Sequence, residues 1–274
     1  MKRLLTFMLF LFWASLTGYA QQGVGRMSVD ELVSQIRKNV EALRASIPDF
    51  VCEENVTSTV RVNSQTALDT SIKSVMRATP KASRDGEFGY NETREIKTVN
   101  GRTPSKPDFA LPFVFNGGFS NDLAGVFAGY DVDCFDFKLA GTTKINDINA
   151  FIITVTTKAN PGPKCHGRPA GVTGTAWVDS ETKQIVRLQG PKDGHTSEMK
   201  NVAVTGWRED MLLNWSVDYA KIVIDDKYFW MPSQVTARVD STSRDRSMRY
   251  VATYKNYHKF GASSKITVDN NNQE

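Results

Sequence analysis

The sequence has few of the residues that enzymes use for catalysis. It contains three histidines and three cysteines in 274 residues, and it lacks G-x-S-x-G, H-E-x-x-H and C-x-x-C motifs. Cys165 and His166 are adjacent, but neighbouring side chains on an extended chain point to opposite sides and do not form a nucleophile and base pair. We therefore predict no catalytic residue, no metal site and no cofactor.

An excess of charge of one sign is also missing. The chain has 34 Lys and Arg against 30 Asp and Glu, and the two signs are interspersed along its length. This balance gives no basis for nucleic acid as a partner. The carboxylates of Asp131, Asp133 and Asp136 gather around Cys134, but a strand places Asp136 on the opposite face from the other two, which argues against a metal site.

Long hydrophobic runs are absent after the first twenty residues. Lys2 and Arg3 precede an apolar run from Leu4 to Leu16, and small residues follow up to Ala20. The run is shorter than the roughly 20 residues that span a bilayer, and its flanks are typical of a secretory signal peptide. We expect cleavage near Ala20, a mature chain that is periplasmic or secreted, and no integral membrane span in that chain. The alternative is an uncleaved N-terminal anchor.

The three cysteines, Cys52, Cys134 and Cys165, then lie in a compartment where disulfides persist. Three pairings are possible, and connectivity cannot be deduced from sequence alone. Alternating segments that begin at Cys134 and at Phe151 fold naturally as a hairpin, which brings Cys134 close to the point where Cys165 follows. This geometry favours a Cys134–Cys165 disulfide, with Cys52 free.

Residues 28–47 have the pattern of an amphipathic helix. Ser28 and Glu31 form a capping-box signature, and Pro48 ends the pattern. The apolar residues recur at helical spacing on one stripe: Val29, Leu32, Val33, Ile36, Val40, Leu43 and Ile47. We expect this stripe to pack on the protein's own sheet.

Most of the remaining chain alternates as strands that are joined by short polar turns. We predict at least eight strands. The segments that alternate are 56–62, 71–79, 87–99, 134–141, 174–179, 185–189, 214–224, 227–239 and 246–258. Short returns imply antiparallel pairing, because parallel neighbours need crossovers of a dozen or more residues. The predicted fold class is mainly β (α+β): a large curved antiparallel sheet or half-barrel with an N-terminal amphipathic helix. We expect one antiparallel β domain at 21–262 and a flexible tail at 263–274.

Two irregular regions interrupt this series of strands. Residues 103–118 are rich in proline, glycine and phenylalanine, and a short helix is expected after them, capped by Ser120 or Asn121. The second region, 160–174, is a loop that contains Cys165. Long loops of this kind are commonly functional or mobile.

Aromatic residues are more numerous than one helix on one sheet can cover. They recur on successive strands of the second half, at Trp177, Trp215, Tyr219, Trp230 and Tyr250 among others. The surplus favours either a closed sandwich or an open, curved sheet with an apolar concavity.

The chain resembles a known superfamily at this point. The chain has one N-terminal helix followed by a long series of strands, and in this it is similar to the periplasmic lipoprotein-carrier superfamily, with its LolA-, LolB- and RseB-like members. The strand segments that carry the resemblance are 174–179, 184–188, 215–219 and 229–232. The Pro48–Cys52 element also resembles one in uncharacterised exported acidobacterial proteins. The resemblance is best over residues 170–260. It implies a curved antiparallel half-barrel, closed by helices, with an apolar cavity for acyl chains.

Three hypotheses for function follow. The first is a non-catalytic envelope protein that binds an apolar small molecule, lipid or lipoprotein in the concavity. Its lid and wall would carry the ligand-binding residues Phe109, Phe113, Phe115, Phe127, Trp177, Trp215 and Trp230. The second is a structural module that binds another envelope protein, and the third is a hydrolase that uses an acidic cluster. The oligomeric state is left open.

Overall fold

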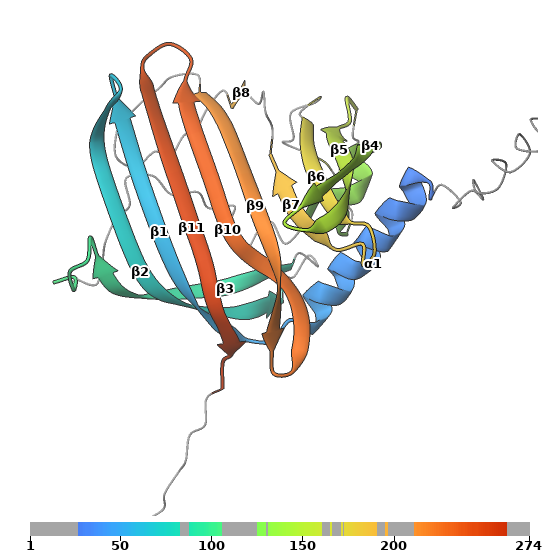
Figure 1. Ribbon diagram of the computed structural model, residues 1–274, viewed down its shortest axis with the longest axis horizontal. Helices are drawn as coiled ribbons and strands as arrows, with labels where there is room; N and C mark the ends of the chain where they lie inside the picture. Colours follow the sequence, from blue (N-terminus) through green and yellow to red (C-terminus); the bar gives the residue numbers. More distant parts are fainter. Residues whose placement is uncertain are drawn as a thin grey trace, which may run out of the picture.

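In the part of the chain that the structure describes, the fold consists of one α-helix and one large antiparallel sheet (Figure 1). The computed structural model describes residues 27–82, 88–105, 125–129, 131–160, 165, 171, 173–190, 195–196 and 211–261. The predicted signal peptide (1–20) and tail (263–274) lie outside these residues. In the described part, helix α1 is Val29–Ser46, and the strands are β1 (Phe50–Val62), β2 (Gln65–Ala82), β3 (Phe88–Val99), β4 (Phe135–Ile145), β5 (Ile148–Thr157), β6 (Thr173–Asp179), β7 (Ile185–Gln189), β8 (His195–Thr196), β9 (Met211–Ile224), β10 (Lys227–Ser241) and β11 (Arg246–Lys259).

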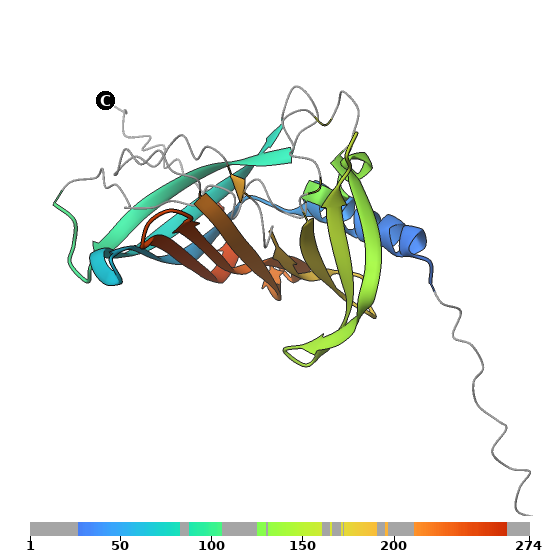
Figure 2. The ribbon, with the colours of Figure 1, turned by 90° about the horizontal axis from the view of Figure 1, so that it is seen from above.

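The sheet is open and strongly curved. Its described strands follow the order β3-β2-β1-β11-β10-β9-β7-β6-β5-β4, and β8 pairs with β9 beside this path. Figure 2 shows the sheet bent into a trough, with β3 and β4 as its two edges. The predicted class, a curved antiparallel sheet with an N-terminal helix, is confirmed, and the open sheet is found rather than the closed sandwich.

Helix α1 begins as its sequence predicts. The Ser28 hydroxyl accepts a hydrogen bond from the Glu31 backbone N–H at 3.1 Å, which satisfies one of the donors that a helix N-terminus leaves unpaired. Leu32, Ile36 and Val40 form its buried stripe. On another side of the helix, the Asn39 amide donates to the carbonyls of residues 182 and 183 in the β6–β7 turn, at 2.9 and 3.1 Å. The helix is therefore attached to the β4–β7 end of the sheet (Figure 1).

Tight turns join many of the strands. In the β9–β10 hairpin both Asp225 and Asp226 have positive φ, 53° and 63°, as a two-residue turn between twisted strands requires. Asn100 and Gly101, an Asn-Gly pair of the kind that favours hairpin turns, also form a tight turn, with φ of 49° and 76°. That turn leads to a single bridge between Val99 and Arg102, whereas the dipeptide predicts a hairpin with a second strand.

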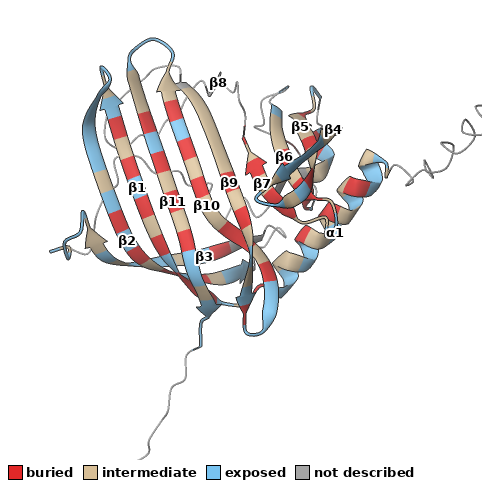
Figure 3. Cartoon of the chain, in the orientation of Figure 1, coloured by how far each residue is buried: buried red, intermediate tan, exposed pale blue. Residues whose placement is uncertain are grey.

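One face of the sheet is apolar across nearly its whole width, and we call it the inner face. Directly paired residues on eight neighbouring strands form a continuous row: Ile72, Val56, Ala252, Val235, Val217, Leu188, Ala176 and Ile153. All eight are buried. Along single strands, buried residues alternate with more exposed ones (Figure 3). This is the period of two that a sheet with one covered face imposes.

The short helix predicted after residue 120 is described only from Gly125. Residues Gly125–Phe127 form a 3-10 turn, η1, and Asp131–Cys134 form a second one, η2. The short helix expected here is therefore described as a single 3-10 turn, η1, which winds more tightly than an α-helix. Among the described residues, no helix is both long and apolar enough to cross a membrane.

The N-cap of α1 gives a direct test of the predicted start of the helix. Ser28→Ala removes the hydroxyl acceptor, and we expect it to lower the free energy of unfolding by about 1 kcal/mol, measured by urea denaturation. Ser34→Ala is the matched control, because Ser34 is exposed inside the helix and Ala has the higher helix propensity. Equal losses in the two variants would contradict a role for the cap.

Candidate functional site

The predicted lid residues are only partly described. Phe109, Phe113 and Phe115 lie outside the described residues, so their role stays a prediction. Phe127 is described in η1 and is fully buried. Its ring stacks on that of Phe137 in β4, with centroids 5.2 Å apart. Phe127 thus belongs to the packed core beside β4, whatever its part in ligand binding.

The three predicted tryptophans do not share one wall. Trp215 pairs with Ala237, on the inner face. Trp177 pairs with Ile152 and Arg187 on the opposite, outer face, where the Arg187 guanidinium lies 5.9 Å from its ring centre.

Trp230 lies beyond an irregularity in strand β10. The register shifts between Pro232 and Gln234, so Trp230 pairs with Lys221 near the tip of the β9–β10 hairpin. Lys221 is exposed, and its ammonium group lies 4.1 Å from the ring centre of the exposed Tyr228. Trp230 therefore lies nearer the hairpin tip, where it packs against the core, and Trp215 is the predicted tryptophan that lies in the middle of the inner face.

A glycine makes room for Trp215. The Gly190 N–H donates to the Trp215 carbonyl at 2.8 Å, and a Cβ atom at residue 190 would lie 1.9 Å from Trp215 Nε1. Since real Cβ contacts essentially never fall below 3.0 Å, any other side chain here would displace the indole. Gly190 thus sets the position of the ring at the end of β7.

A charge cluster interrupts the apolar inner face on the β1–β3 side. It consists of Glu54, Ser74, Glu92 and Arg94, which come from three neighbouring strands. Arg94 Nε lies 2.7 Å from Glu54 Oε2, and Arg94 Nη2 lies 2.9 Å from Glu92 Oε2. The Ser74 hydroxyl donates to Glu54 Oε2 at 2.8 Å. Glu54 is only 2% exposed, so a carboxylate in this position depends on these partners.

The cluster retains capacity to bind hydrogen-bond donors. Glu54 Oε1 and Glu92 Oε1 are both buried without a hydrogen-bond partner in the described part of the chain. Two carboxylates also share one guanidinium. A group with N–H or O–H donors that entered this part of the inner face would therefore find two acceptor oxygens ready.

The charge cluster also affects the groups around it. Burial raises the pKa of the Cys52 thiol to about 12, and the Glu54 charge adds to this effect. Burial likewise raises the pKa of Tyr250 and of Tyr254, with Glu54 acting in the same direction. Burial alone would lower the pKa of Arg94, but its hydrogen bond to Glu54 and the charges of Glu54 and Glu92 outweigh that, so the pKa is raised. At neutral pH Cys52 is a protonated and therefore unreactive thiol.

Sequence reasoning missed this cluster. Glu54 sits at an inward position of β1 between Cys52 and Val56, which are both buried. A charged residue at an inward position of an alternating strand was the signal available in the sequence. It does not identify Arg94 as the partner, because that depends on the register of β2 and β3.

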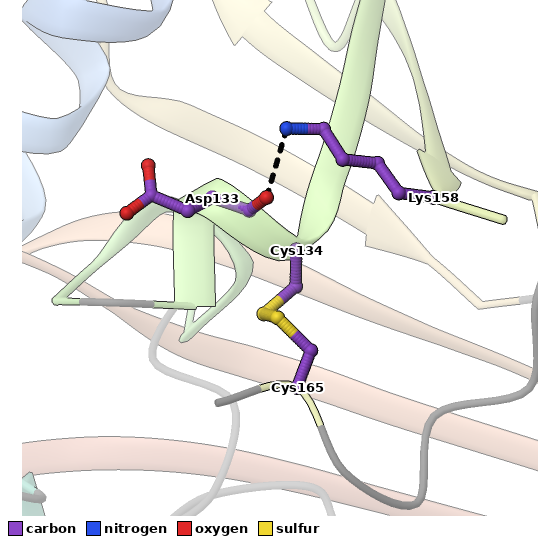
Figure 4. The surroundings of a disulfide bond; sticks show 4 residues. All are labelled: Asp133, Cys134, Lys158 and Cys165. Atoms are coloured by element: carbon purple, nitrogen blue, oxygen red, sulfur yellow. Dashed lines mark hydrogen bonds between the residues drawn. A yellow bond between two sulfur atoms is a disulfide. The ribbon is translucent and has the colours of Figure 1, made fainter. Parts of the chain in front are cut away.

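The predicted disulfide is confirmed. Cys134 and Cys165 are bonded, with their Cα atoms 5.7 Å apart, and Cys52 is free and buried. Figure 4 shows the bond beside the hydrogen bond from Lys158 Nζ to the Asp133 carbonyl, 2.8 Å long. Because Cys165 is bonded to Cys134, its sulfur is not a free thiol next to His166.

Comparisons with known proteins give matches at the level of structure. No protein-family model matches the sequence, and no curated protein matches it. Among solved structures, the chain is similar to a DUF1329 family protein from Desulfovibrio piger, with 13% identity, 86% of this chain and 95% of that chain covered, and a TM-score of 0.40.

Two further structures match to a similar degree. A putative outer membrane lipoprotein-sorting protein domain from Vibrio parahaemolyticus has 9% identity, coverage of 84% of this chain and 92% of that one, and a TM-score of 0.41. A LolA superfamily protein from Nitrosomonas europaea has 10% identity, coverage of 84% and 94%, and a TM-score of 0.37. All three TM-scores are below 0.5, so the function proposed below rests on the geometry of this chain.

The contact between Gly190 and Trp215 can be tested by adding one methyl group. Gly190→Ala should lower the free energy of unfolding by about 1–3 kcal/mol, because the indole must move. Gly261→Ala is the control, since a Cβ atom there meets nothing within 4 Å. If the cost comes from this contact, Trp215→Ala should relieve it in the double variant, so that the two losses are not additive. Additive losses in urea denaturation would contradict the contact.

The disulfide should contribute to stability mainly by restricting the unfolded chain. It joins residues 31 apart in sequence, and the double variant Cys134→Ala, Cys165→Ala should lose about 2–4 kcal/mol of unfolding free energy. Thermal and urea denaturation measure this loss.

The buried thiol of Cys52 should react with iodoacetamide only in denaturant. Peptide mapping that recovers Cys52 in a disulfide with Cys134 or Cys165 would contradict the pairing.

Proposed function

We propose that this chain is an exported, non-catalytic protein that binds an apolar ligand, an acyl chain or a lipoprotein, on the inner face of its sheet. The observation that carries the proposal is the buried apolar row from Ile72 to Ile153 across eight strands. The sheet that carries this row is open, with β3 and β4 as edges. A broad apolar surface inside an open, curved sheet offers a site for a long apolar molecule.

Small residues in the apolar row and in the row next to it favour the same proposal. Ala252 and Ala176 interrupt the larger side chains of the apolar row. In the neighbouring row, Ser58, Tyr250, Ala237 and Trp215 are paired in turn, and Ala237 lies directly beside Trp215. These alanines are buried, so the partly buried Trp215 is the apolar side chain of its row that an acyl chain would contact.

The charge cluster would receive the polar end of the ligand. Glu54, Glu92 and Arg94 lie on the same face as the apolar row, on its β1–β3 side. Their two unpaired carboxylate oxygens accept hydrogen bonds, and Arg94, 38% exposed, is the accessible member of the cluster. An amphiphile with hydroxyl or amino groups in its head would match both parts of the face.

Export is supported by the disulfide. Bonds such as Cys134–Cys165 persist in oxidising compartments and are rare in the cytosol. The N-terminal segment with its signal-peptide pattern agrees with this location. We therefore propose a periplasmic or secreted protein.

Two tryptophans on opposite faces make a matched pair for the binding test. Protein purified from the periplasm without detergent should carry lipid that native mass spectrometry detects. Trp215→Ala should weaken the binding of oleic acid about ten- to a hundredfold, since one buried large side chain contributes roughly 1.5–3 kcal/mol. Trp177→Ala, on the outer face, should leave the affinity unchanged.

Folding is checked alongside binding. Both variants are compared by circular dichroism and thermal unfolding, and Leu213→Ala, a smaller change on the inner face, replaces Trp215→Ala if that variant unfolds. A wild-type protein without bound lipid and without affinity for oleic acid or a triacylated lipopeptide would contradict the proposal. An equal effect of the two tryptophan variants would contradict the assignment of the inner face.

A further inference from the structure

A second site lies on the outer face of the sheet. A cavity of about 470 Å³ opens where β7 ends beside β9 and β10, and β11 completes its wall. Its lining includes three arginines, Arg187, Arg238 and Arg249. Such a volume is within the range of small-molecule sites.

The side chains of this cavity are polar on every strand. Ser216 pairs directly with Thr236 and with Gln189 across the sheet, and the Ser216 and Thr236 hydroxyls are 2.8 Å apart. Trp215 and Ala237 border the cavity too, but their side chains lie on the inner face. The cavity is therefore separate from the proposed apolar site, with the sheet between them.

Two of the arginines are oriented by acids and keep donors available. Arg187 Nε contacts Asp218 Oδ1, and Arg238 Nε lies 2.9 and 2.8 Å from the two oxygens of Asp240. Both pairs use the Nε–H. The terminal Nη groups of Arg187 and Arg238 make no hydrogen bond with another described residue.

The third arginine, Arg249, adds a positive charge that no carboxylate among the described residues neutralises. Arg249 is exposed and lies directly opposite Arg238 in the β10–β11 ladder. It forms no ion pair within the described part of the chain. Like charges directly opposite on neighbouring strands destabilise a sheet, and an anion between them would offset this repulsion.

We propose that this cavity binds a small phosphate-bearing anion through Arg187, Arg238 and Arg249. Guanidinium groups bind phosphate oxygens with paired, charge-assisted hydrogen bonds, and three of them match the several oxygens of one phosphate group. Ser216 and Thr236 add one neutral hydroxyl donor, because the other hydroxyl proton is used in the hydrogen bond between them. The phosphate belongs either to a free small molecule or to a lipid head group, and the two sources share this chemistry.

Calorimetric titration of the mature protein with inorganic pyrophosphate, in about 0.15 M salt, tests the site. The wild type should show saturable binding, and Arg249→Gln should weaken it about ten- to a hundredfold, as expected for the loss of hydrogen bonds from a charged group. Arg249→Lys keeps the charge without the planar guanidinium and should fall between the two. Lys138→Gln, the same change in charge at the exposed Lys138 of β4, is the control and should bind as the wild type does.

Sedimentation with lipid vesicles distinguishes the two sources of the phosphate group. If wild type but not Arg249→Gln sediments with phosphatidylglycerol vesicles, and neither does so with phosphatidylcholine vesicles, the phosphate is a lipid head group. Pyrophosphate binding without vesicle binding identifies a free anion. No binding of either probe, or equal binding by wild type and Arg249→Gln, would overturn the proposal. The variant Arg249→Gln changes a side chain of the outer face, so a loss of pyrophosphate binding in it does not depend on whether lipid binds to the inner face.

Discussion

The antiparallel pairing of β1 with β11 is the interaction on which the rest of the sheet depends. It joins residues 50–62 to residues 246–259 and so connects β1–β3 with the rest of the sheet, β4–β11. Its register places Val56 opposite Ala252 and Ser58 opposite Tyr250. A slip of one residue would turn every β1 side chain to the other face. The continuous inner face exists because this one register is kept.

The two faces of the sheet have different chemistry although they share the same strands. On β9, Trp215 and Val217 face inward, while Asn214 and Ser216 line the outer cavity. The period of two separates apolar from polar residues in this way. A local shift in register changes which β10 residues face inward. Gln234 pairs with Asp218, whereas Pro232, beyond the irregularity, pairs with Tyr219 on the other face of β9.

Local patterns in the sequence predicted much of the fold. The capping signature at Ser28, the short turn between the predicted strands 214–224 and 227–239, and the disulfide between Cys134 and Cys165 all depend on residues that are close in sequence or near one hairpin. The candidate sites were predicted less completely. Trp215 was identified as an aromatic on a strand, but Glu54, Arg94 and Arg187 were not identified, because their partners come from strands whose order in the sheet follows from no local pattern.

The sequence by itself determined the elements: where α1 begins, which segments alternate as strands, and that they pair as antiparallel neighbours through short turns. Only the tertiary structure decided which residues meet. Arg94 reaches Glu54 across 40 positions, and Arg249 lies beside Arg238 because β10 and β11 pair in one register out of several. The physical reason is that alternation specifies a face within each strand, whereas the alignment between strands is set by packing of the whole sheet.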